Sequence, residues 1–188
     1  MAVEILSELT YGHFEQMYRL EARYYGEESI TPADRSFAWY ERYPRSIVAA
    51  ADNGRIVGFV NLFPVKEAVF CALLGGEFND RLMTAEDIAD ADDPSVEKLD
   101  MFLCCVVVDG AYRARGLTKR LLREAASGYA CVQGRCAAVI ADTVTPEGAA
   151  LCERYGFSFI RDSSHGSRIY MQPFARFFEA VGQEEKCG

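Results

Sequence analysis

The chain of 188 residues contains no apolar run close to the roughly 18 residues that a membrane span needs, so we expect no membrane partner. Its first residues, MAVEILSEL, lack the basic and long apolar parts of a signal peptide. None of its seven cysteines has the paired CxxC spacing of a zinc site, and we therefore predict no metal. An odd number of cysteines, several inside apolar strands, favours reduced thiols and a cytoplasmic location.

Positive charge is also scarce. The 20 Lys and Arg residues are outnumbered by 28 Asp and Glu, which gives a net charge of −8. A nucleic-acid-binding protein needs a broad basic face, so nucleic acid is not expected as a partner. Residues 63–100 hold ten acids and three bases, so this segment has a charge of −7 and accounts for most of the net charge. This acidic insertion is either a solvated, solubilising loop and helix or an acceptor-side rim that attracts an amine.

The remaining composition is that of an ordinary globular protein, and the length predicts one domain over residues 1–188. Hydrophobic periodicity predicts a mixed α/β sheet with helices on both sides. The expected strands are 3–7, 46–52, 55–63, 101–108, 136–142, 157–161 and 167–172. The expected helices are 10–25, 31–43, a short one capped by Thr84, 117–129, 146–155 and 174–181. Asn53-Gly54 predicts a tight hairpin turn, and Thr31-Pro32 predicts a helix cap followed by proline at the first helical position.

The most distinctive segment follows the apolar strand 101–108. Five basic residues and no acid lie between Gly110 and Arg123, at the expected start of a helix. Free backbone amides and the helix dipole favour an anion at such a position. A Walker loop is excluded because no G-K-(S/T) follows the glycine, and a dinucleotide fingerprint is excluded because it needs more glycines. The segment therefore predicts a site for a phosphate-bearing ligand.

Two motifs carry a resemblance to a known family. Residues 106–118, VVVDGAYRARGLT, match the strand and pyrophosphate loop, written (Q/R)-x-x-G-x-(G/A), of the GNAT superfamily of acyl-CoA-dependent N-acyltransferases. Residues 145–157, TPEGAALCERYGF, match the second signature, a helix that ends in Gly-Phe. The resemblance covers roughly residues 46–172. It implies a mixed, mostly antiparallel sheet of about six or seven strands, flanked by helices, in which two central strands splay apart.

The resemblance also implies acetyl-CoA as co-substrate. The main chain around Val106 and Val108 is expected to pair with pantetheine, and the loop to wrap the pyrophosphate. The residues expected to bind acetyl-CoA are Val106, Val108, Arg113, Ala114, Arg115, Gly116, Leu117, Thr118, Lys119, Thr145 and Cys152. Thr118 stands where the family prefers Gly or Ala, and Thr145 stands where many members have Asn.

Cys152 occupies the place where the family usually has a tyrosine, the acid that protonates the departing thiolate. Three interpretations stay open: Cys152 is a general acid, a nucleophile that forms an acyl-cysteine, or a small apolar filler. If it is a filler, solvent or Tyr155 supplies the proton, or protonation of the thiolate does not limit the rate. Some members place a basic Glu on the central strand, but 101–108 contains no carboxylate. The candidate bases are Glu77, His165, Asp80 and Asp100.

Together these features predict an N-acetyltransferase that moves an acetyl group from acetyl-CoA to a primary amine by direct attack. The acceptor is expected to be a small molecule or a peptide. The alternative is a non-catalytic acyl-CoA-binding regulatory module, because the usual Tyr and strand Glu are missing. A third hypothesis is a protein-interaction domain that uses Phe174, Phe177 and Phe178. Family members often dimerise, so a homodimer is also an expectation.

Overall fold

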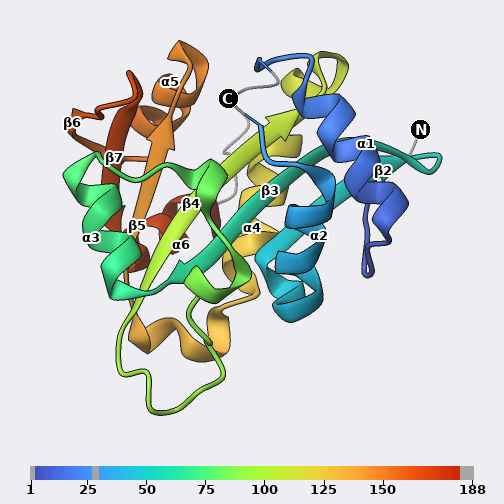
Figure 1. Cartoon of the computed structure of the whole chain (residues 1–188). Helices are drawn as coiled ribbons and strands as arrows, with labels where there is room; N and C mark the ends of the chain where they lie inside the picture. The colour runs from blue at the N-terminus through green and yellow to red at the C-terminus, as the bar shows by residue number, and fades with distance from the viewer. Residues whose placement is uncertain (1–2, 27–29, 183–188) are drawn as a thin grey trace.

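The structure is a computed structural model that describes residues 3–26 and 30–182, without the side chain of Ala114. Its centre is a seven-stranded sheet in the order β1-β2-β3-β4-β5-β7-β6 (Figure 1). All neighbouring strands are antiparallel except β4 and β5, which are parallel. The strands are β1 (Glu4–Ile5), β2 (Ile47–Asp52), β3 (Arg55–Val65), β4 (Leu99–Val108), β5 (Cys136–Thr143), β6 (Ser158–Asp162) and β7 (Arg168–Pro173). This confirms the mixed, mostly antiparallel sheet expected from the sequence.

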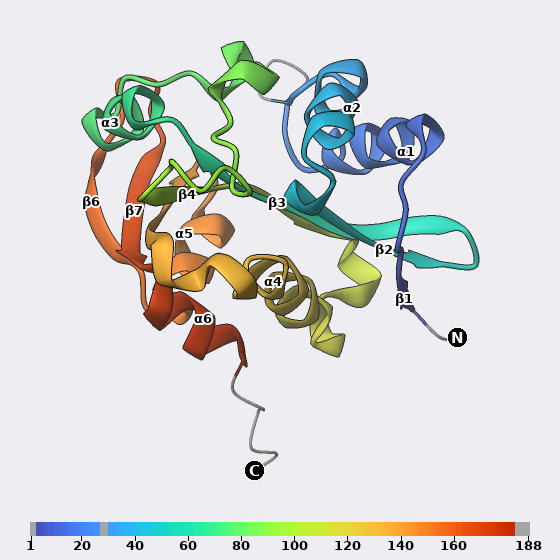
Figure 2. The same cartoon turned by 90° about the horizontal axis from the view of Figure 1, so that it is seen from below.

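Helices cover both faces of the sheet (Figure 2). The α-helices are α1 (Tyr11–Glu21), α2 (Ala33–Arg42), α3 (Glu67–Gly75), α4 (Leu117–Ser127), α5 (Pro146–Arg154) and α6 (Phe174–Gly182). Short 3-10 helices are η2 (Pro44–Ser46), η3 (Asp80–Leu82), η4 (Ala85–Asp87), η5 (Gly110–Arg115) and η6 (Ala130–Arg135). Buried side chains of α1, α2 and α3 pack on one face, and those of α4, α5 and α6 pack on the other.

Local sequence explains several of these elements. In the β2–β3 hairpin, Asn53 and Gly54 have φ values of 52° and 75°, as a two-residue type I′ turn requires. Helix α1 buries Phe14, Met17 and Leu20, which recur at helical spacing. Its predicted extension to Tyr25 is wrong, because the helix ends at Glu21 and turns follow.

Helix α2 starts later than its sequence signals predict. Pro32 is the N-cap, in an extended conformation with ψ of 145°, and Ala33 is the first helical residue. The prediction of a Thr31 cap is therefore wrong. Thr31 instead contributes to the lining of a cavity, which is described below.

The acidic insertion is more structured than a solvated loop. It contains α3, which the sequence analysis missed and which buries Val69, Phe70 and Leu73 against the sheet. The short helix capped by Thr84 is present as η4. The insertion therefore supplies part of the core as well as most of the negative charge.

Helix α6 is not an exposed interaction helix. Phe174 and Phe177 are fully buried and belong to the core that α4 and α5 also build. The third hypothesis from the sequence fails at these two residues, because their rings are already covered. No helix among residues 3–26 and 30–182 has both the length and the apolar character of a membrane span.

Candidate functional site

Strands β4 and β5 lie side by side over only part of their length. Their parallel pairing begins at Leu99 and ends where Leu103 of β4 faces Ala141 of β5. Beyond this point the two strands diverge toward their carboxyl ends (Figure 1). The splay of the central strands implied by the resemblance is confirmed.

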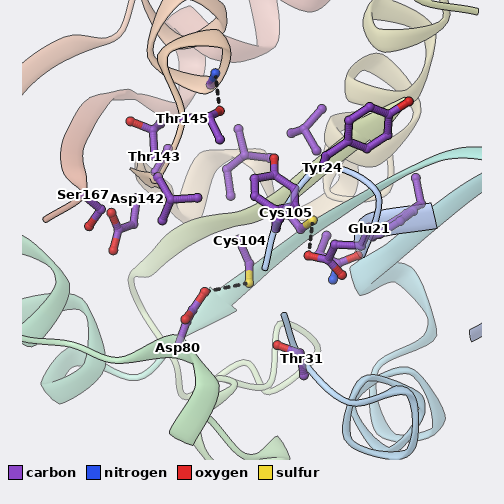
Figure 3. Close-up of a pocket in the computed structure, with 18 of the residues that line it drawn as sticks. Glu21, Tyr24, Thr31, Asp80, Cys104, Cys105, Asp142, Thr143, Thr145 and Ser167 are labelled. Carbon is purple, nitrogen blue, oxygen red and sulfur yellow. Dashed lines mark hydrogen bonds between the residues drawn. The ribbon is translucent and has the colours of Figure 1, made fainter. Parts of the chain in front are cut away.

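A cavity of about 630 Å³ opens at this divergence. Its wall combines residues of α1, the end of β4, the end of β5, the start of α5 and the acidic insertion. Figure 3 shows polar side chains from all of these segments around it. Two expected binding positions on β4, Val106 and Val108, belong to the lining, as do Arg113, Thr118, Thr145 and Cys152.

The backbone of β4 presents polar groups to the gap. The amide of Asp109 donates to the carbonyl of Val57 at 2.9 Å, so the backbone groups of Asp109 and Val107 face β3. Because these directions alternate along a strand, the groups of Val106 and Val108 point into the gap. The carbonyl of Val108 accepts a hydrogen bond from Nε of Arg113 at 3.0 Å. The predicted pairing with pantetheine requires this orientation of the two valines.

The basic loop lies at the carboxyl end of β4. Gly116 is the N-cap of α4 and has a φ of 71°, a conformation that glycine adopts without strain. Leu117, Thr118 and Lys119 are the first three residues of α4, so their backbone amides have no hydrogen-bond partner within the helix. Arg113 and Arg115 are exposed beside them. The loop therefore combines free amides with two guanidinium groups.

Contacts to distant elements fix the loop. The hydroxyl of Tyr112 donates to Oδ2 of Asp52 at 2.6 Å, which ties η5 to the β2–β3 hairpin. Tyr24, just after α1, accepts a hydrogen bond from the amide of Gly110 at 2.8 Å. Its ring also lies under the guanidinium of Arg113, 4.4 Å from the centroid. The loop is thus joined to the helix that forms the opposite wall of the cavity.

A bulge in β4 shapes the floor of the cavity. Asn61 of β3 faces Cys105, but the next residue, Leu62, faces Leu103, so Cys104 is the extra residue. Leu103 packs on the α4 side, whereas Cys104 and Cys105 both contact cores on the α1–α3 side. Two consecutive thiols therefore project into the same cavity (Figure 3).

Glu21, the last residue of α1, reaches one of these thiols. Sγ of Cys105 lies 3.2 Å from Oε1 of Glu21 (Figure 3). Burial raises the pKa of Glu21 from 4.5 to about 7, against the lowering effect of the Cys105 hydrogen bond. Burial also raises the pKa of Cys105 well above its ordinary value, and the Glu21 charge adds to this. The thiol is therefore the donor and the carboxylate the acceptor.

Asp80 and Asp142 are among the other carboxylates that line the same cavity. Oδ2 of Asp80, in η3, lies 3.9 Å from Sγ of Cys104. Burial raises the pKa of Asp80, and the charge of Asp142 raises it further. Burial likewise raises the pKa of Asp142 on β5, although a hydrogen bond from Ser167 and the nearby His165 act to lower it. Figure 3 shows Asp142 beside Ser167 and shows Asp80 pointing toward Cys104.

The α5 side of the cavity holds the residues of the second motif. Oγ1 of Thr145 accepts a hydrogen bond from the amide of Gly148 at 3.1 Å and thereby caps α5. Tyr25, which follows α1, also lines the cavity, and Thr145 lies close enough to its hydroxyl to lower the pKa of Tyr25 against the larger raising effect of burial. Tyr25 therefore reaches across the gap from the α1 wall to the start of α5.

Cys152 lies in the packed part of α5. It is 4% exposed and belongs to the core cluster beneath α4 and α6. Burial raises the pKa of its thiol to about 12, and the neighbouring Glu153 contributes. Tyr155 is buried as well and is not among the residues that line the cavity.

The other sequence-predicted bases are dispersed. His165 lines the cavity and its Nε2 lies 3.4 Å from the carbonyl of Glu77. The side chain of Glu77 is exposed, and this residue does not contribute to the lining. Asp100 is buried at the opposite end of β4, where it pairs with Lys98 at 2.8 Å. Of the four candidates, only Asp80 and His165 reach the cavity.

Sequence reasoning missed Glu21, yet a signal was available. Phe14 and Met17 mark the apolar face of α1, and Glu21 follows Met17 by four residues on that same face. A carboxylate on the buried stripe of a helix needs a partner or a function. The bulge at Cys104 gave no such signal, because an apolar run does not show an irregular register.

No group of three or more metal-ligating side chains occurs in the described ranges, and the predicted absence of a metal is not tested further. The site combines a basic loop with free amides, an open strand edge and an acidic wall. In this wall Glu21 contacts the thiol of Cys105, and Asp80 lies near the thiol of Cys104.

Comparisons with known proteins point in one direction. A family model described as the acetyltransferase (GNAT) family matches residues 14–157. The chain matches none of the curated protein sequences with which it was compared.

Solved structures with similar folds were also found. The loading GNATL domain of CurA from Lyngbya majuscula has a TM-score of 0.68 at 10% identity, covering 93% of this chain and 99% of that one. Ard1 from Thermoplasma volcanium has a TM-score of 0.61 at 15% identity, with coverages of 92% and 98%. Arabidopsis thaliana Naa50, in complex with the bisubstrate analogue CoA-Ac-MVNAL, has a TM-score of 0.59 at 11% identity, with coverages of 92% and 99%. At identities this low, the structural similarity shows a shared fold and nothing more.

Proposed function

Because the chain belongs to the acetyltransferase (GNAT) family, we propose that it transfers the acetyl group of acetyl-CoA to a primary amine by direct attack in a ternary complex. The observation that carries this proposal is Glu21. Its carboxylate lies in the cavity at the strand divergence, with a pKa of about 7. A general base works best when its pKa is close to the working pH.

The open edge of β4 and the basic loop fit acetyl-CoA. The backbone groups of Val106 and Val108 face the gap, where the amides of pantetheine can pair with them. The amides of Leu117, Thr118 and Lys119, with Arg113 and Arg115, suit the pyrophosphate. Gly116 permits close approach of the backbone. Naa50, which shares the fold, was solved with an analogue that contains CoA, and this supports the assignment.

The reaction at the acyl carbon requires one base and one route for the leaving group. The neutral amine forms the C–N bond, the C–S bond breaks, and the amine proton passes to Glu21 directly or through water. CoA leaves as a thiolate. The carboxylates of Asp80 and Asp142 keep the cavity negative, which favours a cationic amine as the ligand that enters.

Cys152 is poorly suited to protonate that thiolate. A free thiol has a pKa of about 8.5, whereas burial raises the pKa of Cys152 to about 12. The proton would move to a weaker base, and a nucleophilic thiolate at Cys152 would be equally costly. We assign Cys152 to packing. Burial raises the pKa of the Tyr25 hydroxyl well above its ordinary value, so this group stays protonated, and we propose it as a hydrogen-bond donor to the leaving sulfur that does not give up its proton.

The non-catalytic alternative rested on the missing strand Glu and the missing Tyr. Glu21 and Tyr25 supply a carboxylate and a hydroxyl from a different element, so the enzyme is the better supported function. Release of CoA thiol from acetyl-CoA, measured across a panel of primary amines, tests it. Amine-dependent release that falls in Glu21→Gln supports the proposal. Binding of CoA by calorimetry without turnover of any amine would support the binding module instead.

A further inference from the structure

Of the four carboxylates that line the cavity, Glu21, Asp80 and Asp142 form a row, and Glu147 lies in the first turn of α5. Glu21 contacts Cys105, Asp80 lies near Cys104, and Asp142 follows Ile140 by two residues on the same face of β5 (Figure 3). Because Cys104 and Cys105 are adjacent in β4, the first two carboxylates are held at neighbouring points of the cavity floor. The charge of Asp80 raises the pKa of Glu21, and the charge of Asp142 raises that of Asp80.

Few fixed cations balance this row. Arg81 lies beside Asp80, and His165 acts on Asp142, but both side chains are exposed at the rim. Arg113 is held by Tyr24 and the Val108 carbonyl on the side of the basic loop. Repulsion between neighbouring carboxylates is costly in a partly buried site unless a cation neutralises it.

Asn61 provides an independent observation. This residue of β3 is 6% exposed and lines the same cavity, directly opposite Cys105 in the sheet. Its buried Oδ1 has no hydrogen-bond donor within the described residues. Among residues 3–26 and 30–182, Oδ1 of Asp142 is likewise buried without a donor. A buried acceptor without a donor is unfavourable, so these atoms favour a ligand that brings N–H groups.

We propose that the acceptor substrate carries two basic nitrogens on a short spacer, so that one amine attacks beside Glu21 and Asn61 while Asp80 and Asp142 bind the second as a cation. An ammonium group has three donors and no acceptor, which matches a subsite lined by two carboxylates. The inference rests on the proposed acetyltransferase function and adds the class of acceptor. A peptide that offers only its terminal amine leaves the second subsite unfilled.

Three amines with the same four-carbon chain test the second subsite with acetyl-CoA as donor. Diaminobutane, with an amine at each end, is compared with butylamine and with aminobutanol, whose second polar group is neutral. We expect kcat/KM for diaminobutane to exceed that for each monoamine by roughly tenfold or more, since close charge pairs contribute strongly in a desolvated site. Asp80→Asn and Asp142→Asn should each reduce the ratio of kcat/KM for diaminobutane to kcat/KM for a monoamine toward one.

The matched control is Glu97→Gln. Glu97 is an exposed acid of the same insertion and does not line the cavity, so its removal changes the net charge without changing the site. The ratio should stay at its wild-type value in this variant. Calorimetry with CoA checks that Asp80→Asn and Asp142→Asn retain the folded binding loop.

The outcomes separate the two proposals. Equal kcat/KM for diamine and monoamines, or a preference that survives in both Asp variants, overturns the second subsite and leaves the acetyltransferase standing. A preference lost equally in Glu97→Gln also overturns it, because bulk charge would then be the cause. No turnover of any amine overturns the proposed function itself.

Discussion

Sγ of Cys105 lies 3.2 Å from Oε1 of Glu21, although 84 positions separate the two residues in the chain. The contact joins the end of α1 to the bulge in β4, at the point where β4 leaves β5. It positions a carboxylate with a pKa of about 7 at the mouth of the strand gap. The two residues therefore connect the open edge of the sheet with a group that accepts a proton near neutral pH.

Glu21→Gln should lower kcat by about 100-fold or more, because the amide cannot accept the proton of the attacking amine. In the wild-type enzyme kcat/KM should rise with pH through an apparent pKa of about 7, since only the ionised carboxylate is a base. Initial rates of CoA release from pH 5 to 9 measure both effects. Glu15→Gln, on the exposed face of the same helix, is the control and should retain the wild-type profile. A wild-type profile in Glu21→Gln would contradict the assignment.

Stability should depend on pH in the opposite sense. Glu21 has a pKa raised from 4.5 to about 7 in the folded state, so the folded protein binds the proton more tightly than the unfolded chain does. Its contribution to stability is fully present below pH 4.5 and is lost as the pH rises through 7, by at most about 3 kcal/mol. Glu21→Gln should therefore have a Tm several degrees above that of wild type at pH 8. At pH 5 the difference in Tm between the two proteins should be smaller. Thermal unfolding at both pH values tests this difference.

Cysteine reactivity should follow exposure. Cys71 and Cys131 are exposed, whereas Cys152 is buried and has a pKa of about 12. Iodoacetamide at pH 7.5 should modify Cys71 and Cys131 and leave Cys152 unmodified in the native protein, because the thiolate is the reactive form. Peptide mass spectrometry reads out each site. Fast alkylation of Cys152 that also abolishes turnover would restore it as a catalytic candidate.

Tyr25→Phe should lower kcat by about 10-fold or more while acetyl-CoA binding changes little, because the ring stays and only the hydroxyl is removed. Cys152→Ala should leave kcat within a few-fold of wild type and reduce stability, as the loss of a small buried side chain does. Steady-state kinetics and calorimetry with CoA on the two variants distinguish the roles. A large loss of kcat in Cys152→Ala with none in Tyr25→Phe would reverse the assignment.

Gly116→Ala should weaken CoA binding and lower the free energy of unfolding by about 1 kcal/mol. The φ of 71° disfavours a Cβ atom, although the structure shows open space around the position. Gly134→Ala is the matched control, since Gly134 has equally open space and no positive φ. Calorimetry with CoA and urea unfolding should show a change only at Gly116. Equal effects at the two glycines would mean that the loop conformation is unimportant.

Some elements were predictable because their signals are local. The Asn53-Gly54 turn, the apolar stripe of α1 and the glycine-containing basic loop each depend on a few neighbouring residues. Helix α3 was missed because its sequence is apolar on nearly all sides and lies within a segment whose charge dominates the composition. The start of α2 was misplaced because Thr31 is a favourable cap residue, yet the structure uses it in the cavity lining.

The sequence by itself determined the order of the strands, the basic loop and its place after a buried strand, because backbone conformation at glycine and apolar periodicity act over short distances. Only the tertiary structure decided which carboxylates meet. Glu21, Asp80 and Asp142 come from α1, η3 and β5, and their pKa values depend on shared burial and on one another's charge. The bulge at Cys104 and the separation of β4 from β5 are likewise properties of strand pairing, which no single segment encodes.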